Sequence, residues 1–155
     1  KLKSTPILPA IANKCTTKFV EPPIAAFKII AFSKASGNIK TLAPIKIEPA
    51  TIIEKHRHSA FAGTTLDIWL KENGINELTV CGIRSEQCCE TTTRHGSDIG
   101  YNVNYVTDAT LTFDMHHSDG SLLTAEQIKH RTETVLSGRF ATIRSVDDAI
   151  VHFSK

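Results

Sequence analysis

The sequence contains no aspartate before Asp67, a single methionine and a single tryptophan, and no long apolar run. Its most apolar stretches, residues 78–81 and 143–151, fall well short of the roughly 20 residues that a membrane helix needs. The N-terminal Lys1-Leu2-Lys3 is not followed by the apolar core and small-residue cleavage site of a secretory signal. We therefore expect a cytoplasmic protein with no membrane partner.

Cysteine is present but lacks the spacing of a structural site. The four cysteines are Cys15, Cys81, Cys88 and Cys89, with no C-x-x-C pair among them. This pattern argues against both a zinc knuckle and a disulfide scaffold. Reduced thiols, as in cytosolic proteins, fit best.

The sequence also gives little support for a metal or a cofactor. Histidines cluster at 56–58 and 116–117, but without the i, i+4 helical spacing and accompanying carboxylate of a catalytic metal site. Gly96 and Gly100 do not form a G-x-G-x-x-G phosphate loop. We expect surface or supporting roles for the histidines, and neither a metal nor a cofactor.

Charge is distributed unevenly along the chain. Residues 1–60 carry ten basic and three acidic side chains, whereas residues 61–155 carry eight and thirteen. A basic segment can bind nucleic acid, but these lysines are scattered and no aromatic residues are interleaved with them. We therefore predict a solvated lysine-rich surface and no nucleic-acid partner.

From about residue 61 onward, helical and strand patterns alternate, which is typical of βαβ units and a mostly parallel sheet. A length of 155 residues suits one such domain, which would bury roughly two thirds of its unfolded surface. The expected helices lie between Thr65 and Gly74 and over about 85–99, 124–137 and 146–151, and the expected strands are 77–83, 103–106 and 141–144.

Several of these boundaries rest on local signals. Thr124 and Gln127 form a capping box that starts the helix over 124–137. Ser85 is expected to cap the start of the helix over about 85–99. Residues 108–110 are predicted to form a turn after a strand. The first 60 residues are less regular, with strands expected at 27–32 and 51–54 and a helix within 5–19.

Cys88 is the most informative residue for chemistry. With Ser85 as the cap it is the third residue of a helix that follows a buried strand. Free backbone N–H groups and the helix dipole favour a thiolate there and offer donors for an oxyanion. A thiol in the first turn can equally be a core residue. Cys89 competes for the role, but lies about 100° further round the helix, and Cys81 is expected in the core.

Lys55 directly follows the expected strand at 51–54, which places it at the carboxyl edge of the sheet, where open α/β folds build their sites. A lysine at this edge could hold a neighbouring thiolate charged and transfer protons. A solvated lysine is the alternative interpretation.

Two segments resemble the motifs of the isochorismatase-like cysteine hydrolases. Residues 55–66 (KHRHSAFAGTTL) are similar to the family's lysine motif, and residues 82–92 (GIRSEQCCETT) to its G-[IV]-x-[ST]-x-x-C-V-x-x-T motif. Residues 98–101 (DIGY) and 107–110 (TDAT) match in order and distance. The resemblance covers about residues 48–145.

The resemblance implies a Cys-Lys-Asp triad that cleaves amide or related C–N bonds. Cys88 matches its nucleophile and Lys55 its lysine, while Cys89 replaces the family's usual Val. The backbone N–H groups of Arg84 and Cys88 would form the oxyanion hole, with a cis peptide between Ile83 and Arg84. The substrate pocket is expected to include His58, Phe61, Arg84 and Ser85.

Two departures from the family pattern matter. The triad Asp ends the family's first strand, yet no Asp precedes Asp67, so the general base has no counterpart in this chain. The metal-binding Asp-x-His motif of nicotinamidase-like relatives is also missing, since no His precedes His56. The chain also lacks an initiator Met and is shorter than typical relatives, so we expect a fragment or a divergent front part.

We predict an α/β fold, a three-layer α/β/α domain over 1–155 with a mostly parallel, about six-stranded Rossmann-like sheet that lacks the family's first strand. The expected function is hydrolysis of a small amide, carbamoyl or ureido substrate through an acyl-enzyme on Cys88. A catalytically silent member of the fold, acting as a ligand-binding or oligomer-forming protein, is the alternative, and an isochorismate-type vinyl ether hydrolase is another. A homo-oligomer, dimer or tetramer, is expected.

Overall fold

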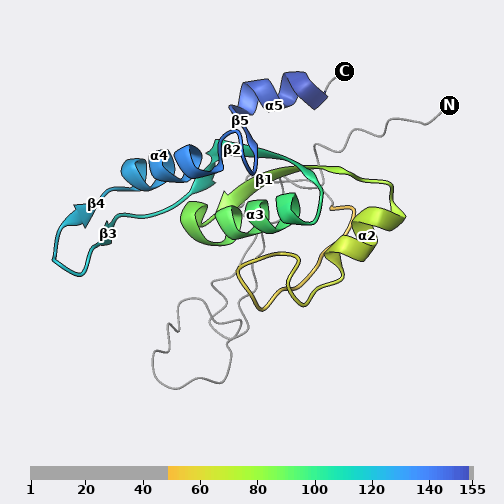
Figure 1. The fold of residues 1–155 in the computed structure, drawn as a ribbon, viewed down its shortest axis with the longest axis horizontal. Helices are drawn as coiled ribbons and strands as arrows, with labels where there is room; N and C mark the ends of the chain where they lie inside the picture. The colour runs from red at the N-terminus through yellow and green to blue at the C-terminus, as the bar shows by residue number, and fades with distance from the viewer. Residues whose placement is uncertain (1–48, 154–155) are drawn as a thin grey trace.

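The structure, a computed structural model, describes residues 49–153, in which helices and strands alternate (Figure 1). The predicted helix within 5–19 and the predicted strand at 27–32 lie outside the described residues. In chain order the elements are α2 (Leu66–Glu72), β1 (Glu77–Ile83), the π-helical segment η3 (Ser85–Cys89), α3 (Glu90–Asp98), β2 (Asn102–Leu111), β3 (Met115–His116), β4 (Leu122–Leu123), α4 (Ala125–Leu136), β5 (Thr142–Arg144) and α5 (Val146–Phe153).

The central sheet of the described region is parallel, with strand order β1-β2-β5. Val80 of β1 pairs with Tyr105 of β2, which pairs in turn with Ile143 of β5. The helical run η3–α3 connects β1 to β2, and α4 lies between β2 and β5, so both connections are helical crossovers. The predicted parallel α/β arrangement is therefore confirmed, whereas the prediction of about six strands extends beyond the described residues.

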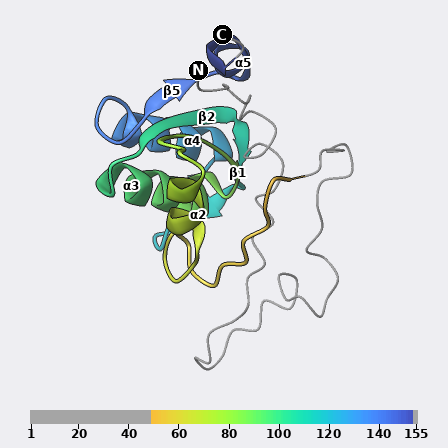
Figure 2. The ribbon, with the colours of Figure 1, turned by 90° about the vertical axis from the view of Figure 1, so that its right-hand side faces the viewer.

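Helices cover both faces of this sheet. Helices α3 and α4 pack on one face, and α5 lies on the other, which gives the three-layer arrangement visible in Figure 2. Layering of this kind buries the apolar strands from both sides.

The core lies between the sheet and α2, α3 and α4, and Tyr105 and Leu136 are fully buried within it. Gly96 of α3 allows the helix to approach closely. A Cβ atom at this position would lie 3.2 Å from a ring carbon of Phe61 and 3.4 Å from a methyl group of Leu78. The absence of a side chain therefore sets how near α3 lies to the sheet and to the loop that carries Phe61.

Local signals fixed several boundaries correctly. Strand β1 spans the predicted residues 77–83. Helix α2 ends just before Gly74, which has a positive φ of 66°. At the start of α4, Thr124 and Gln127 form both hydrogen bonds of the predicted capping box.

Two predicted elements are wrong. Residues 51–54 form no strand, and Ile52 is 57% exposed. The apolar residues of this segment have a high strand propensity. A central strand of a parallel sheet must also be covered on both faces, and the exposed Ile52 shows that this segment is not. Residues 108–110 continue β2 instead of forming a turn, because the register with β1 shifts between Val80 and Gly82 and so accommodates extra β2 residues.

The sequence pattern missed a short antiparallel hairpin made by β3 and β4. It projects from the layered body (Figure 1) and carries Leu122 and Leu123, which are 51% and 42% exposed. Across residues 49–153, no helix has the length and apolar character needed to cross a membrane.

Candidate functional site

Cys88 lies where the sequence predicts, at the start of a helical run directly after β1, and its side chain is only 4% exposed. The helical run begins one residue earlier than a Ser85 cap would imply. Arg84, in extended conformation, is the N-cap, and Ser85 is the first helical residue. Cys88 is consequently the fourth helical residue. The Ile83–Arg84 peptide bond that precedes it is cis.

The predicted capping role of Ser85 is wrong for a physical reason. Its hydroxyl is fully buried and donates a hydrogen bond of 2.7 Å to the hydroxyl of Thr110 on β2. Its backbone carbonyl accepts a hydrogen bond of 3.2 Å from the hydroxyl of Tyr105. These two bonds fasten the start of η3 to β2, and they account for Ser85 without a substrate.

His58 contacts the sulfur of Cys88. Its Nδ1 atom lies 3.8 Å from Cys88 Sγ, within hydrogen-bonding range for sulfur, although the residues are 30 positions apart. The thiol is buried whereas His58 is exposed. The imidazole therefore lies between the sulfur and solvent-accessible surroundings, in a loop that the sequence pattern left without secondary structure.

Lys55 holds that loop in shape. A solvated surface lysine was the alternative interpretation of Lys55, but its side chain is only 7% exposed. Its ammonium group donates hydrogen bonds of 2.8 Å to the backbone carbonyls of Arg57 and of His58. Lys55 thus links to Cys88 through His58, and it follows an irregular segment, not the strand end that was predicted.

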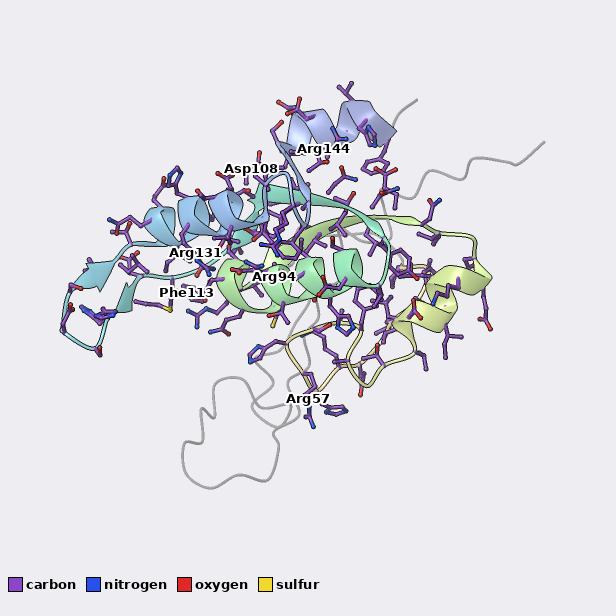
Figure 3. All side chains as sticks on the ribbon, viewed as in Figure 1. Arg57, Arg94, Asp108, Phe113, Arg131 and Arg144 are labelled. Atoms are coloured by element: carbon purple, nitrogen blue, oxygen red, sulfur yellow. The ribbon has the colours of Figure 1, made fainter. Side chains whose placement is uncertain are left out.

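The Arg84 side chain, at the start of η3, lies near Met115 of the hairpin and near Phe113, which Figure 3 labels. Its guanidinium group lies 2.8 Å from a carboxylate oxygen of Glu86 and 2.8 Å from the sulfur of Met115, and 5.8 Å from the ring centre of Phe113. Glu86 also accepts a hydrogen bond of 2.6 Å from Thr112. Sequence reasoning missed the contacts with Met115 and Phe113, because no local pattern relates residue 84 to residues about 30 positions later.

Phe61 is a core residue in the structure. It is 7% exposed, and its ring stacks on Tyr101 and lies at an angle to the ring of His95. The nearby hydroxyl of Ser59 is 2.8 Å from His95 Nδ1. This packing explains Phe61 without a substrate, so its predicted place in the pocket gains no support.

Cys88 and Cys89 have different surroundings. Cys89 is 2% exposed and belongs to the hydrophobic core cluster. Cys88 is the thiol that contacts His58. The two sulfurs therefore lie in different environments, because adjacent residues of a helix point in directions about 100° apart.

Glu90, which sequence analysis did not single out, lies two residues after Cys88. It is 6% exposed and forms ion pairs with Arg94 on its own helix and with Arg131 on α4. Thr132 of α4 donates a further, longer hydrogen bond of 3.5 Å to the same carboxylate. This network fastens the helical run that carries Cys88 to α4.

Residues 49–153 contain no group of three or more His, Cys, Asp or Glu side chains arranged to hold a metal ion. A groove of about 490 Å³ does exist where α4 meets the ends of β2 and β5, with Thr107, Lys129 and Arg144 among its walls. None of the side chains predicted for the site lines that groove.

Comparison with known proteins identifies the family. The family model described as the isochorismatase domain matches residues 33–139. The chain belongs to the isochorismatase family. The family resemblance of the two motifs is therefore confirmed, and the isochorismatase fold with it.

Individual relatives agree with this assignment. The isochorismatase family protein YrdC of Bacillus subtilis is 32% identical over 109 residues, which cover 70% of this chain and 58% of that protein. Ureidoacrylate amidohydrolase RutB of Variovorax paradoxus is 28% identical over 144 residues, which cover 92% of this chain and 52% of RutB. The chain thus spans between half and three fifths of the length of these relatives.

A solved structure shows the same isochorismatase fold. The crystal structure of an isochorismatase-like protein from Burkholderia xenovorans superposes with a TM-score of 0.75 at 31% identity, covering 84% of this chain and 63% of that one. Hydrolases are among the relatives, which supports an enzyme of this family.

Proposed function

We propose that this chain belongs to a cysteine hydrolase that cleaves a small amide, carbamoyl or ureido C–N bond, with Cys88 as the nucleophile. The observation that carries the proposal is the position of Cys88, a buried thiol at the start of a helix and in contact with His58. The match to an amidohydrolase of ureidoacrylate supports this class of bond.

In the proposed reaction, Cys88 Sγ attacks the carbonyl carbon of the substrate and forms a tetrahedral intermediate. The backbone N–H groups of Arg84 and Cys88 stabilise the negative oxygen, which is the role that the family resemblance gives them. The nitrogen leaves, and water then hydrolyses the thioester to release the acid.

Lys55 contributes in two ways. Its positive charge favours the thiolate form of a neighbouring cysteine. Its hydrogen bonds to the carbonyls of Arg57 and His58 keep the loop beside Cys88 in one conformation. A preorganised site of this kind avoids the cost of ordering the loop during the reaction.

Of the four side chains expected in the substrate pocket, two keep that role in this proposal. His58 contacts the reactive sulfur, and Arg84 precedes η3 with its side chain 26% exposed. Ser85 and Phe61 have structural roles instead. Ser85 is hydrogen-bonded to β2, and Phe61 packs in the hydrophobic core.

The test is turnover of small primary amides and of N-carbamoyl and ureido compounds, followed by ammonia release. Cys88→Ala should abolish release, and intact-mass spectrometry should detect an acyl adduct on the unmodified chain. Cys89→Val is the matched control, because it changes the adjacent thiol to the residue usual in the family. Full turnover by Cys88→Ala would rule out the proposed mechanism.

A further inference from the structure

We infer that Thr92 and His95 are positioning residues of the proposed site. They hold the Lys55 loop, residues 55–64, against the helical run that carries Cys88. The inference rests on the proposed function, because the loop held in this way is the one that reaches the proposed nucleophile. Both residues act through the loop, and neither is assigned a part in the chemistry itself.

Two polar contacts fasten the Lys55 loop to α3. The hydroxyl oxygen of Ser59 lies 2.8 Å from Nδ1 of His95. The backbone N–H of the next residue, Ala60, donates a hydrogen bond of 3.0 Å to the hydroxyl of Thr92. The partners are 36 and 32 positions apart in the sequence. Because each contact joins two separate segments, the two together fix where the loop lies on the helix.

The side of the helical run that receives these contacts is also the side of Cys88. Thr92 follows Cys88 by four positions, and His95 follows Thr92 by three. Residues three and four positions apart are neighbours on one face of a helix. His58 approaches the Cys88 sulfur to 3.8 Å at the start of this face. The two fastened residues come directly after His58 in the chain, so the contacts restrain the backbone from which its imidazole projects.

The hydrogen-bonding groups at the first contact are paired consistently. The Ser59 oxygen accepts a hydrogen bond of 3.1 Å from the backbone N–H of Phe61. Its hydroxyl hydrogen is then available for Nδ1 of a neutral His95 that carries its own hydrogen on Nε2. Ser59 is only 5% exposed, so a loop that moved off His95 would leave a buried donor without an acceptor. This cost favours one position of the loop.

Phe61 adds an apolar contact at the same place. Its ring centre lies 5.4 Å from that of His95 and 5.6 Å from that of Tyr101. Polar contacts and ring packing therefore occur at adjacent residues of the loop, which restrains both its position and its orientation. A loop that is already ordered does not have to be ordered during the reaction.

The contacts join the two sequence motifs directly. Thr92 is the last residue of the cysteine motif, whereas Ser59 and Ala60 belong to the lysine motif. The sequence pattern gave none of these three residues a role. In the structure they align one motif with the other.

The first experiment measures amide hydrogen exchange in the full chain and in Thr92→Val, which removes the hydroxyl and keeps a similar shape. The amide of Phe61 should exchange about tenfold faster or more, although its own acceptor on Ser59 is unchanged, because the loop opens as a unit. Thr92→Ser keeps the hydroxyl and should restore slow exchange. Thr91→Val, an exposed change one position earlier on α3, is the matched control. The amides of α4 should exchange alike in all four chains, which shows that the variants are folded.

The second experiment uses turnover of a small amide that the unmodified chain hydrolyses. Thr92→Val and His95→Leu should each lower kcat by about 10- to 100-fold with a smaller change in KM, because misplaced groups slow the reaction more than they weaken binding. His95→Asn places an amide oxygen, which is an acceptor, near the position of Nδ1 and should recover most of the rate. A merely structural contact would lower the unfolding midpoint without this split between kcat and KM.

The outcomes separate the inference from the proposed function. Unchanged exchange of the Phe61 amide in Thr92→Val would overturn the inference. Faster exchange with full turnover would overturn the positioning role as well, because the loop would then be fastened without effect on the reaction. Absence of turnover in the unmodified chain would count against the proposed function, and the exchange experiment would still decide whether Thr92 holds the loop.

Discussion

The ammonium nitrogen of Lys55 lies 2.8 Å from the backbone carbonyl oxygen of His58. This buried lysine therefore acts on the site partly through the backbone, by fixing the residue that touches the thiol. A positive charge alone would not need that hydrogen bond.

Lys55→Met should remove both hydrogen bonds while keeping a similar volume. Because hydrogen bonds from charged groups contribute roughly 1.5–3 kcal/mol each at most, we expect a loss of about 1–3 kcal/mol in the free energy of unfolding. Alkylation of Cys88 at pH 7 should slow as well. Urea unfolding and peptide mapping measure the two effects.

Lys71→Met is the control, since Lys71 is a largely exposed helix residue paired with Asp67. It should leave both the unfolding midpoint and the labelling rate close to the wild-type values. An unchanged labelling rate in Lys55→Met would contradict the link from Lys55 to the thiol.

Glu90→Gln should weaken the attachment of the Cys88 helical run to α4. The amide keeps the shape but loses the charge that pairs with Arg94 and Arg131. Since both arginines reach solvent, we expect a moderate loss of about 1–2 kcal/mol, below that for breaking a fully buried pair. Urea unfolding measures it.

Glu126→Gln, an exposed change on α4, serves as the comparison for Glu90→Gln. Equal stability of the two variants would mean that the Glu90 network is energetically neutral.

Glu77 gives a prediction about pH. Burial raises the pKa of the Glu77 carboxyl, but hydrogen bonds from Asn104 and His152 lower it by more. The pKa therefore lies below its usual value. A lowered pKa in the folded state means stability that is present above the unfolded value near 4.5 and is lost as pH falls through the folded value. Thermal unfolding of Glu77→Gln should therefore depend less on pH below 4.5 than the wild type.

Glu72→Gln, at the exposed end of α2, is the matched change for this experiment. Its acid profile should follow the wild type. Identical acid profiles for Glu77→Gln and the wild type would show that the Asn104 and His152 contacts do not stabilise the charged carboxylate.

Local signals in the sequence predicted the parts of the fold that short-range interactions determine. The capping box at Thr124 and the glycine after α2 act within a few residues, and β1 was found because its apolar run is bounded on both sides. The hairpin was missed because each of its strands has only two residues. A two-residue strand has no period to detect.

The site was predicted through its two motifs but not through its contacts. Cys88 and Lys55 were found from the family resemblance, whereas the approach of His58 to Cys88 joins positions 30 apart. The same holds for Arg84 and Met115, which are 31 positions apart. Contacts of this kind depend on how the chain folds back on itself, which periodicity does not encode.

Gly96 lies eight residues after Cys88 in the sequence, but its packing affects the loop beside that thiol. Even one methyl group there would press against the ring of Phe61, three residues after His58, on the same loop that reaches over the thiol. The Phe61 ring or the helix would have to move by a few tenths of an ångström. A residue two helical turns after Cys88, which contributes only by having no side chain, therefore bears on the packing of the loop that brings His58 to the thiol.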